Sequence, residues 1–146
     1  MTTTAPAADS RVLALAHYAA RGVLEHVLAR HGATFQQQIA LRAAAGTPQT
    51  PDGLVALVQG YLKADPAGIR ATLDDLLAGR LLVADGPHLR PTDAGHELLA
   101  VVGAETAPLS ARIWGGIPAE DLAATGRVLA LVTERADAEL AALSAP

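Results

Sequence analysis

The chain has 146 residues, of which 51% are apolar, and a formal net charge of −4 at pH 7. This length suits a single domain with a real hydrophobic core, and the lack of cysteine excludes disulfides, thiolate metal sites and cysteine nucleophiles. No apolar run reaches membrane-spanning length, and residues 1–10 lack the basic start and apolar segment of a secretion signal. We therefore expect a cytoplasmic protein with a disordered tail over residues 1–9.

The first predicted helix runs from residue 10 to about residue 31, with Ser10 as its N-cap and Gly32 as its stop. Apolar residues such as Leu13 and Leu24 recur along it at helical spacing and form a broad surface. An apolar surface of this width needs two packing partners, for example the core of its own chain and another subunit.

The second predicted helix begins at Thr34 and ends at Gly46. Phe35 and Ile39 belong to an apolar stripe along one of its faces. Gln38 lies three residues after Phe35, beside this stripe, and is the candidate among the polar residues to point inward.

Two further helices start in the same way. Thr-Pro-Asp at residues 50–52 combines a capping hydroxyl, a proline at the first helical position and an acid near the positive end of the helix dipole. This third helix extends to about Lys63. Asp-Pro at residues 65–66 starts the fourth helix, which Gly79 ends. Each helix has one apolar face, so the pair is a predicted helix-turn-helix.

A β-hairpin follows the helix-turn-helix. Residues 81–83 are a short apolar strand, and Asp85-Gly86 is a strong signal for a hairpin turn. The chain returns over residues 88–90, and Pro91 closes the second strand, which is acceptable at the end or edge of a sheet. The hairpin is therefore the expected wing.

The last two helices complete the chain. Thr92-Asp93 caps a fifth helix, which Pro108 is expected to kink or to break near Thr106. Two glycines at residues 115–116 interrupt the chain before the last helix starts at Pro118. That helix has a seven-residue repeat of apolar residues, which suits packing along another helix; its members are Leu122, Leu129, Ala136 and Leu143.

The predicted fold is mainly α with a small β-wing: a winged helix-turn-helix flanked by N-terminal and C-terminal helices. Its parts and their order resemble the MarR family of bacterial regulators over about residues 10–143. The segments that carry the resemblance are TFQQQIALRAAA (34–45), TPDGLVALV (50–58), DPAGIRATLDDLLAGRLL (65–82), LRPTDAGHELL (89–99), which is similar to the family's LTxxG motif, and IPAEDLAATGRVLALVTERADAEL (117–140).

The resemblance implies a homodimer in which the first, fifth and sixth helices interlock between subunits. It implies one domain over residues 10–146, with a winged helix at about 34–95 and dimerisation helices at about 10–31 and 93–143. The fourth helix would enter the major groove of double-stranded DNA, and the wing tip would reach the minor groove. A small, often aromatic or acidic, organic ligand would bind between the dimerisation helices and the winged helix and change DNA affinity.

The residues expected to contact DNA are few. The family's wing is usually longer and carries arginines, whereas the tip here is Asp85-Gly86-Pro87. On the exposed face of the fourth helix, only an arginine and a threonine suit contacts with bases or phosphates. The expected DNA-binding residues are Lys63, Arg70, Thr72, His88 and Arg90.

The winged helix is also acidic. Residues 34–97 carry five positive and seven negative charges, a net charge of −2. Several of the acids are expected to be helix caps that point away from a groove. Because neutralising phosphates supplies much of the affinity for DNA, we expect binding that is weak, narrowly specific, or lost.

The ligand-binding candidates come mainly from the first two helices. His17 and Arg21 are four residues apart and share a helix face. An arginine among aromatic residues would suit an acidic aromatic ligand. The alternative is that Arg21 pairs with Glu25, that Tyr18 packs in the dimer interface and that the single tryptophan is a packing residue. The full set of candidates is His17, Tyr18, Arg21, Phe35, Gln38, Arg42 and Trp114.

No motif for catalysis is present, and the five histidines lack the spacing of a metal site, so we expect no metal and no cofactor. The leading hypothesis is a homodimeric, small-molecule-responsive, DNA-binding transcriptional regulator of MarR type. The alternative is a dimer of this fold that has lost DNA binding. It would work as a small-molecule binding protein or, with less support, as an enzyme that uses the pocket between the helices.

Overall fold

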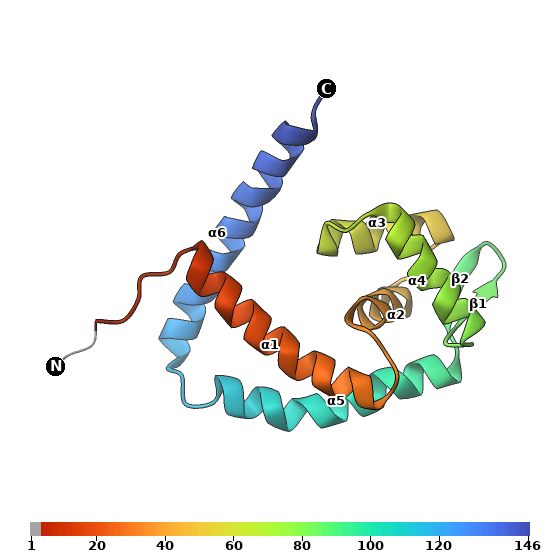
Figure 1. Cartoon of the computed structure of the whole chain (residues 1–146), viewed down its shortest axis with the longest axis horizontal. Helices are drawn as coiled ribbons and strands as arrows, with labels where there is room; N and C mark the ends of the chain where they lie inside the picture. The colour runs from red at the N-terminus through yellow and green to blue at the C-terminus, as the bar shows by residue number, and fades with distance from the viewer. Residues whose placement is uncertain (1–3) are drawn as a thin grey trace. The chain divides into compact units, whose positions relative to one another are not determined.

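A computed structural model describes residues 4–146 (Figure 1). Over these residues the chain is mainly α-helical with one small antiparallel hairpin, which confirms the predicted fold class. Residues 4–9 carry neither helix nor strand, and residues 1–3 of the expected tail lie outside the described residues. The elements are α1 (Ser10–Arg30), α2 (Phe35–Gly46), α3 (Pro51–Leu62), α4 (Pro66–Ala78), β1 (Leu82–Asp85), β2 (His88–Pro91), α5 (Asp93–Trp114) and α6 (Ala119–Ser144).

The chain divides into two compact units, of which the first ends at Pro108 and the second begins at Leu109. The winged helix, formed by α2, α3, α4 and the hairpin, lies entirely within the first unit, together with α1 and most of α5. The second unit contains the end of α5 and α6. Between residues 4 and 146, no helix is long and apolar enough to cross a membrane.

The N-caps show how the first two helices begin. Asp9, rather than the predicted Ser10, caps α1: its carboxylate accepts a hydrogen bond from the Val12 N–H at 2.8 Å, which satisfies a free N–H of the first turn. The predicted start of α2 is confirmed. Thr34 accepts a bond from the Gln37 N–H at 3.1 Å, and the Gln37 side chain accepts one from the Thr34 N–H at 2.9 Å.

The predicted helix-turn-helix is confirmed in α3 and α4. Thr50 and Asp65 are their N-caps, and each is followed by a proline in the first turn. The apolar faces of α2, α3 and α4 meet in one core, which the hairpin closes at one end (Figure 1). The largest fully buried side chains of this core are Leu41, Leu54, Val58, Ile69, Leu76 and Leu82.

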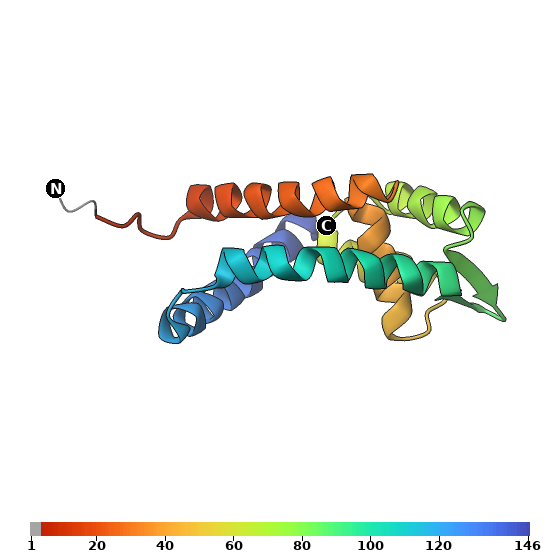
Figure 2. The same ribbon diagram turned by 90° about the horizontal axis from the view of Figure 1, so that it is seen from below.

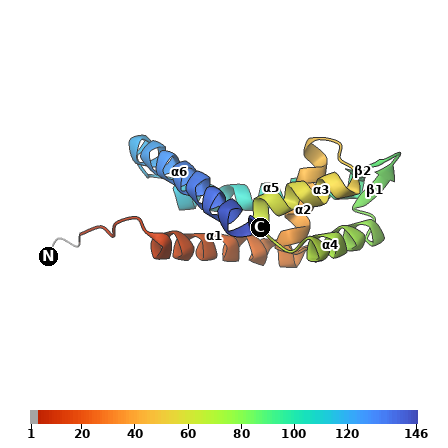
Figure 3. The same cartoon turned by 90° about the horizontal axis from the view of Figure 1, so that it is seen from above.

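The hairpin forms the predicted wing. Leu82 pairs with Pro91 and Asp85 with His88, so β1 starts and ends later than predicted, at Leu82–Asp85. Gly86 has a φ of +59° at the turn, a conformation that favours glycine. The hairpin projects beyond the helices of the winged helix (Figure 2, Figure 3). Gln49 forms an isolated antiparallel bridge with β2, which ties the loop before α3 to the wing.

The junction between the wing and α5 depends on Thr92 and Gly95. The Thr92 hydroxyl donates to the Arg80 carbonyl at 2.7 Å and accepts from the Gly95 N–H at 3.1 Å, so the predicted cap of α5 is confirmed. Gly95 lies against the carbonyl of Leu81, where a Cβ atom would clash with the backbone. A glycine is therefore required at this position because the helix and the strand approach closely.

Pro108 was expected to kink α5 or to break it near Thr106, and the break is wrong, because α5 continues as one helix through Pro108 to Trp114. A proline removes one backbone hydrogen bond from a helix, and the turns on either side keep theirs. In the second unit, Gly116 has a φ of +79° in the turn before α6. α6 is an unbroken helix of 26 residues, none of which is buried.

Candidate DNA-binding and ligand-binding surfaces

Helix α4 places the predicted Arg70 on its exposed face. The Arg70 guanidinium pairs with the Asp52 carboxylate at the start of α3, with 2.7 Å between Nη2 and Oδ1. Asp52, the acid predicted near the positive end of the α3 dipole, therefore faces α4. The two side chains are 54% and 82% exposed, so the pair is screened by water and contributes little to stability.

Thr72 on the same helix is half-buried and already has hydrogen-bond partners. Its hydroxyl donates to the Gly68 carbonyl at 3.1 Å and accepts from Gln36 Nε2 at 2.8 Å. Gln36 also donates to the Gly68 carbonyl at 3.2 Å. A hydroxyl donates one hydrogen bond and accepts up to two, and here the donor and one acceptor position are already used. A hydrogen-bond donor of DNA could therefore bind only the remaining lone pair unless these bonds break.

The wing carries the other predicted readers of DNA. Arg90 on β2 pairs with Asp85 of the turn, with 3.3 Å between Nε and Oδ2. His88 is half-buried and lies opposite Asp85 in the hairpin register. The returning strand of the short wing therefore presents a paired arginine and a partly covered histidine.

Lys63 lies at the end of α3, in the left-handed conformation with a φ of +53°. Its ammonium donates to the Gly60 carbonyl at 2.7 Å, next to the negative end of the helix dipole. The predicted DNA-binding residues thus lie on α3, α4 and the wing of one winged helix, and Arg70, Thr72 and Arg90 are all engaged within the chain.

The predicted ligand residues do not form one cluster. Arg21 pairs with Glu25 at 3.0 Å, as the alternative interpretation expected, and its guanidinium also lies 4.2 Å from the centre of the Phe35 ring. His17 and Tyr18 lie one turn earlier on α1, with ring centroids 5.9 Å apart. They line an open groove on α1 itself, of about 400 Å³.

Gln38 points into the protein, as the sequence suggested. It is 5% exposed, and its Oε1 has no hydrogen-bond partner in the described part of the chain. A buried acceptor without a partner is costly, so a donor from water or from a bound molecule would stabilise this position.

Arg42 lies on another surface, with its side chain exposed between α2 and α3. It lines an open pocket of about 440 Å³ with the half-buried Ile39 and Leu57 and the exposed Tyr61. Trp114, the remaining candidate, is 53% exposed and belongs to the second unit.

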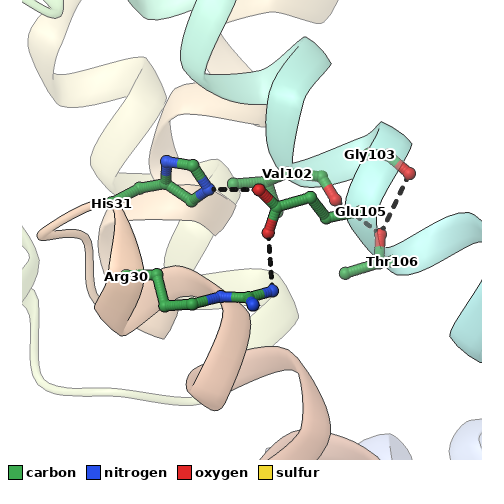
Figure 4. Close-up of polar contacts among 6 residues, drawn as sticks. All are labelled: Arg30, His31, Val102, Gly103, Glu105 and Thr106. Carbon is green, nitrogen blue, oxygen red and sulfur yellow. Dashed lines mark hydrogen bonds and ion pairs between the residues drawn. The ribbon is translucent and has the colours of Figure 1, made fainter.

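A polar cluster that the sequence analysis missed ties the end of α1 to α5. Figure 4 shows the Glu105 carboxylate between two partners: Arg30 Nη2 at 2.7 Å and His31 Nε2 at 3.0 Å. The side chains of Glu105, Arg30 and His31 are 33%, 56% and 23% exposed, respectively. Arg30 and His31 precede Glu105 by 75 and 74 residues in the chain, so no local sequence pattern could identify these contacts. Over residues 4–146, no three His, Cys, Asp or Glu side chains are grouped as metal ligands.

No protein-family model and no curated protein matches the chain. Among solved structures, it is similar to Staphylococcus aureus MarR in complex with salicylate and kanamycin, with a TM-score of 0.77 at 19% identity over 88% of this chain and 90% of that one. For a MarR family transcription regulator, SP03579, the TM-score is 0.72 at 21% identity, over 90% and 87%. For the Mycobacterium tuberculosis MarR family protein Rv2887 in complex with p-aminosalicylic acid, the TM-score is 0.68 at 17% identity, over 86% and 98%.

These neighbours match this chain in backbone structure over most of its length. Their identities to this chain are low, so the similarity is one of fold. The chain has the MarR-type winged-helix fold.

Proposed function

We propose that the protein is a homodimeric DNA-binding transcriptional regulator that responds to a small organic ligand. The observation that carries this proposal is the exposed face of α4, presented by a packed helix-turn-helix beside a projecting hairpin. A second helix of this kind is suited to the major groove of DNA, and a hairpin beside it can reach the backbone. Arg70, Thr72 and Arg90 are the proposed contacts, with Lys63 and His88 as further candidates.

The apolar surfaces outside the winged helix support a homodimer. In α6, the large apolar side chains on one helix face are exposed, and the same is true of several on α1. An isolated amphipathic helix is only marginally stable in water, so these surfaces call for a partner. A second copy would supply matching surfaces; the residues on α6 are Leu129, Val132, Leu140 and Leu143.

The ligand response is proposed for the face that α1 and α2 share. Arg21 stacks on Phe35 there, and the buried acceptor of Gln38 needs a donor. Structures similar in fold were determined with salicylate and with p-aminosalicylic acid, which are aromatic acids. An acidic aromatic molecule is therefore the first ligand class to test, with His17 and Tyr18 beside the site.

DNA binding is tested with the region upstream of the protein's own gene, at low and high salt, by fluorescence anisotropy. Wild-type protein is expected to bind weakly but with sequence preference. Arg70→Ala removes one phosphate or base contact per subunit, so in a dimer the slope of log K against log[salt] should fall by about 2. Arg11→Ala, an exposed arginine on α1 outside the winged helix, is the matched control and should leave the slope unchanged.

Asp52→Asn sharpens the same experiment. The substitution removes the carboxylate that neutralises Arg70 and keeps a side chain of similar size. DNA affinity at low salt should rise by about tenfold, because a negative charge beside the phosphates is lost. Equal affinity of wild type, Arg70→Ala and Asp52→Asn for the preferred site would contradict the placement of Arg70 at the DNA.

The second candidate function is a ligand-binding dimer that no longer binds DNA. The specific observation in its favour is that Arg70 and Arg90 each pair with a carboxylate of the same winged helix. Absence of binding at low salt, to both the upstream region and a random-sequence pool, would reject the regulator and leave this candidate. Tight, site-specific binding that Arg70→Ala abolishes would reject the ligand-binding alternative.

A further inference from the structure

We propose that the pocket between α2 and α3 binds a small aromatic carboxylate, with Arg42 holding the carboxylate. This site is separate from the face of α1 and α2 considered above, because it lies on the winged helix itself. Its existence does not depend on DNA binding. The pocket has a volume of about 440 Å³, and its lining residues include Ile39, Arg42, Leu57 and Tyr61.

The walls of the pocket suit a flat apolar body. Ile39 and Ala43 on α2 and Leu57 on α3 are half-buried and belong to its apolar lining. The Tyr61 side chain at the rim is 63% exposed, which offers both a ring face for stacking and a phenol for a hydrogen bond. Small-molecule pockets span roughly 300–1,000 Å³. This pocket is near the lower end of that range, so it suits a ligand with a single ring.

Arg42 differs from the arginines that already have partners. Arg21, Arg30, Arg70 and Arg90 each pair with a carboxylate of the chain. Within residues 4–146, the Arg42 guanidinium forms no ion pair and no hydrogen bond, although it lines a largely apolar pocket. A guanidinium binds a carboxylate through two parallel hydrogen bonds, so an anionic group on the ligand would complete this site.

The pocket is connected to the wing through Gln49. Gln49 lines the pocket, and its carbonyl accepts a hydrogen bond from the Leu89 N–H of β2 at 2.8 Å. A ligand that contacts Gln49 would change the environment of the Leu89 amide. The wing can therefore report on the occupied pocket without any DNA.

The experiment is a titration of the ¹⁵N-labelled protein with benzoate, followed by amide chemical shifts. We expect saturable shifts centred on residues 39–49 and 57–61, with a smaller shift at Leu89. The dissociation constant should be on the order of 1 mM, because a single ring makes few contacts. Benzamide keeps the ring but lacks the negative charge, and acetate keeps the carboxylate but lacks the ring. Neither compound should bind as tightly as benzoate.

Two arginine variants form a matched pair. Arg42→Gln should weaken benzoate binding about tenfold or more, because a charged hydrogen bond to the carboxylate is lost. Arg11→Gln removes an exposed arginine on α1 that does not line this pocket and belongs to neither proposed ligand site, so it should leave benzoate affinity unchanged. Tyr61→Ala should weaken binding several-fold. All three positions are on the surface or half-exposed, and unchanged thermal melting confirms that each variant is folded.

Several outcomes would overturn the proposal. They are a lack of saturable shifts, benzoate affinity unaffected by Arg42→Gln, or benzamide binding as tight as benzoate. Shifts centred on Arg21 and Phe35, lost in Arg21→Gln alone, would also overturn it and would instead support the ligand face in the proposed function. Failure of DNA binding leaves the titration unaffected, so the two proposals can fail independently.

Discussion

The winged helix and helix α6 use the same apolar residue types but bury them to opposite extents. Leu54, Ile69 and Leu76 in the winged helix are 0% exposed, whereas Leu143 in α6 is 83% exposed and no residue of α6 is buried. The winged helix completes its own core from three helices and a hairpin. Helix α6 has one apolar face and no core of its own, so its stability requires a partner surface.

The largest effect is expected from Leu76→Ala, which leaves a cavity in the winged-helix core. Leu76 is fully buried among α2, α4 and the hairpin, so the free energy of unfolding should fall by about 2–5 kcal/mol. Leu143→Ala, the same substitution on α6, should change it by less than about 0.5 kcal/mol within a monomer. Chemical denaturation of both variants at low protein concentration measures the difference. Equal losses would show that the two regions are not different in packing.

Gly95→Ala tests the close approach at the end of the wing. A Cβ atom would meet the Leu81 carbonyl, so the backbone must shift and the free energy of unfolding should fall by about 1–3 kcal/mol. Gly103→Ala is the control on the same helix α5, because a Cβ atom there meets nothing within 4 Å. That variant should gain about 0.5–1 kcal/mol from helix propensity. A loss of stability in Gly103→Ala would contradict this explanation.

Val132→Asp tests the partner surface of α6. It places a charge on the face that carries Leu129 and Leu140, and a dimer would bury two such carboxylates. The dissociation constant of the dimer should rise about tenfold or more, which is ~1.4 kcal/mol. Ala141→Asp is the control: at 100° per residue Ala141 lies on the opposite side of the helix from Val132, so it should have no such effect.

Sedimentation equilibrium over a range of protein concentrations measures the assembly. The proposed dimer fails if wild-type protein is a monomer at all concentrations. The assignment of the face fails if Ala141→Asp dissociates the protein as strongly as Val132→Asp.

The smallest effect is expected at the cluster that ties α1 to α5. Glu105→Gln removes the carboxylate shared by Arg30 and His31, and because this ion pair is partly exposed the loss should be about 0.2–1 kcal/mol. Glu97→Gln, on the same helix without an ion-pair partner in the described chain, should lose less. Thermal unfolding at low and high salt measures both. A loss in Glu105→Gln that does not shrink in high salt would contradict an electrostatic origin.

Much of the fold could be predicted because its signals are local. The capping residues Thr34, Thr50 and Asp65, and the Asp-Gly turn of the wing, act within a few residues of their positions in the chain. Of the kink or break that Pro108 was expected to cause in α5, the break was wrong. A proline signal is local as well, whereas the continuity of α5 depends on the turns around it.

The site was less predictable because its contacts join distant segments. The sequence selected Arg70, Arg90 and Arg21 as exposed cations at helical or strand positions, yet the partner of Arg70 is 18 residues away and belongs to another helix. Gln36, which reaches α4, and Gln38, which points inward, are neighbours with different surroundings. Residue type alone does not distinguish them.

The sequence by itself determined the order of helices, the hairpin and the acidic winged helix, because periodicity, caps and charge are properties of short segments. The tertiary structure decided which charges are neutralised: Arg70 and Arg90 have carboxylate partners, whereas Arg42 lines a pocket without one. The reason is physical. An ion pair depends on a few ångströms between side chains from separate elements, and only the packing of those elements sets that distance.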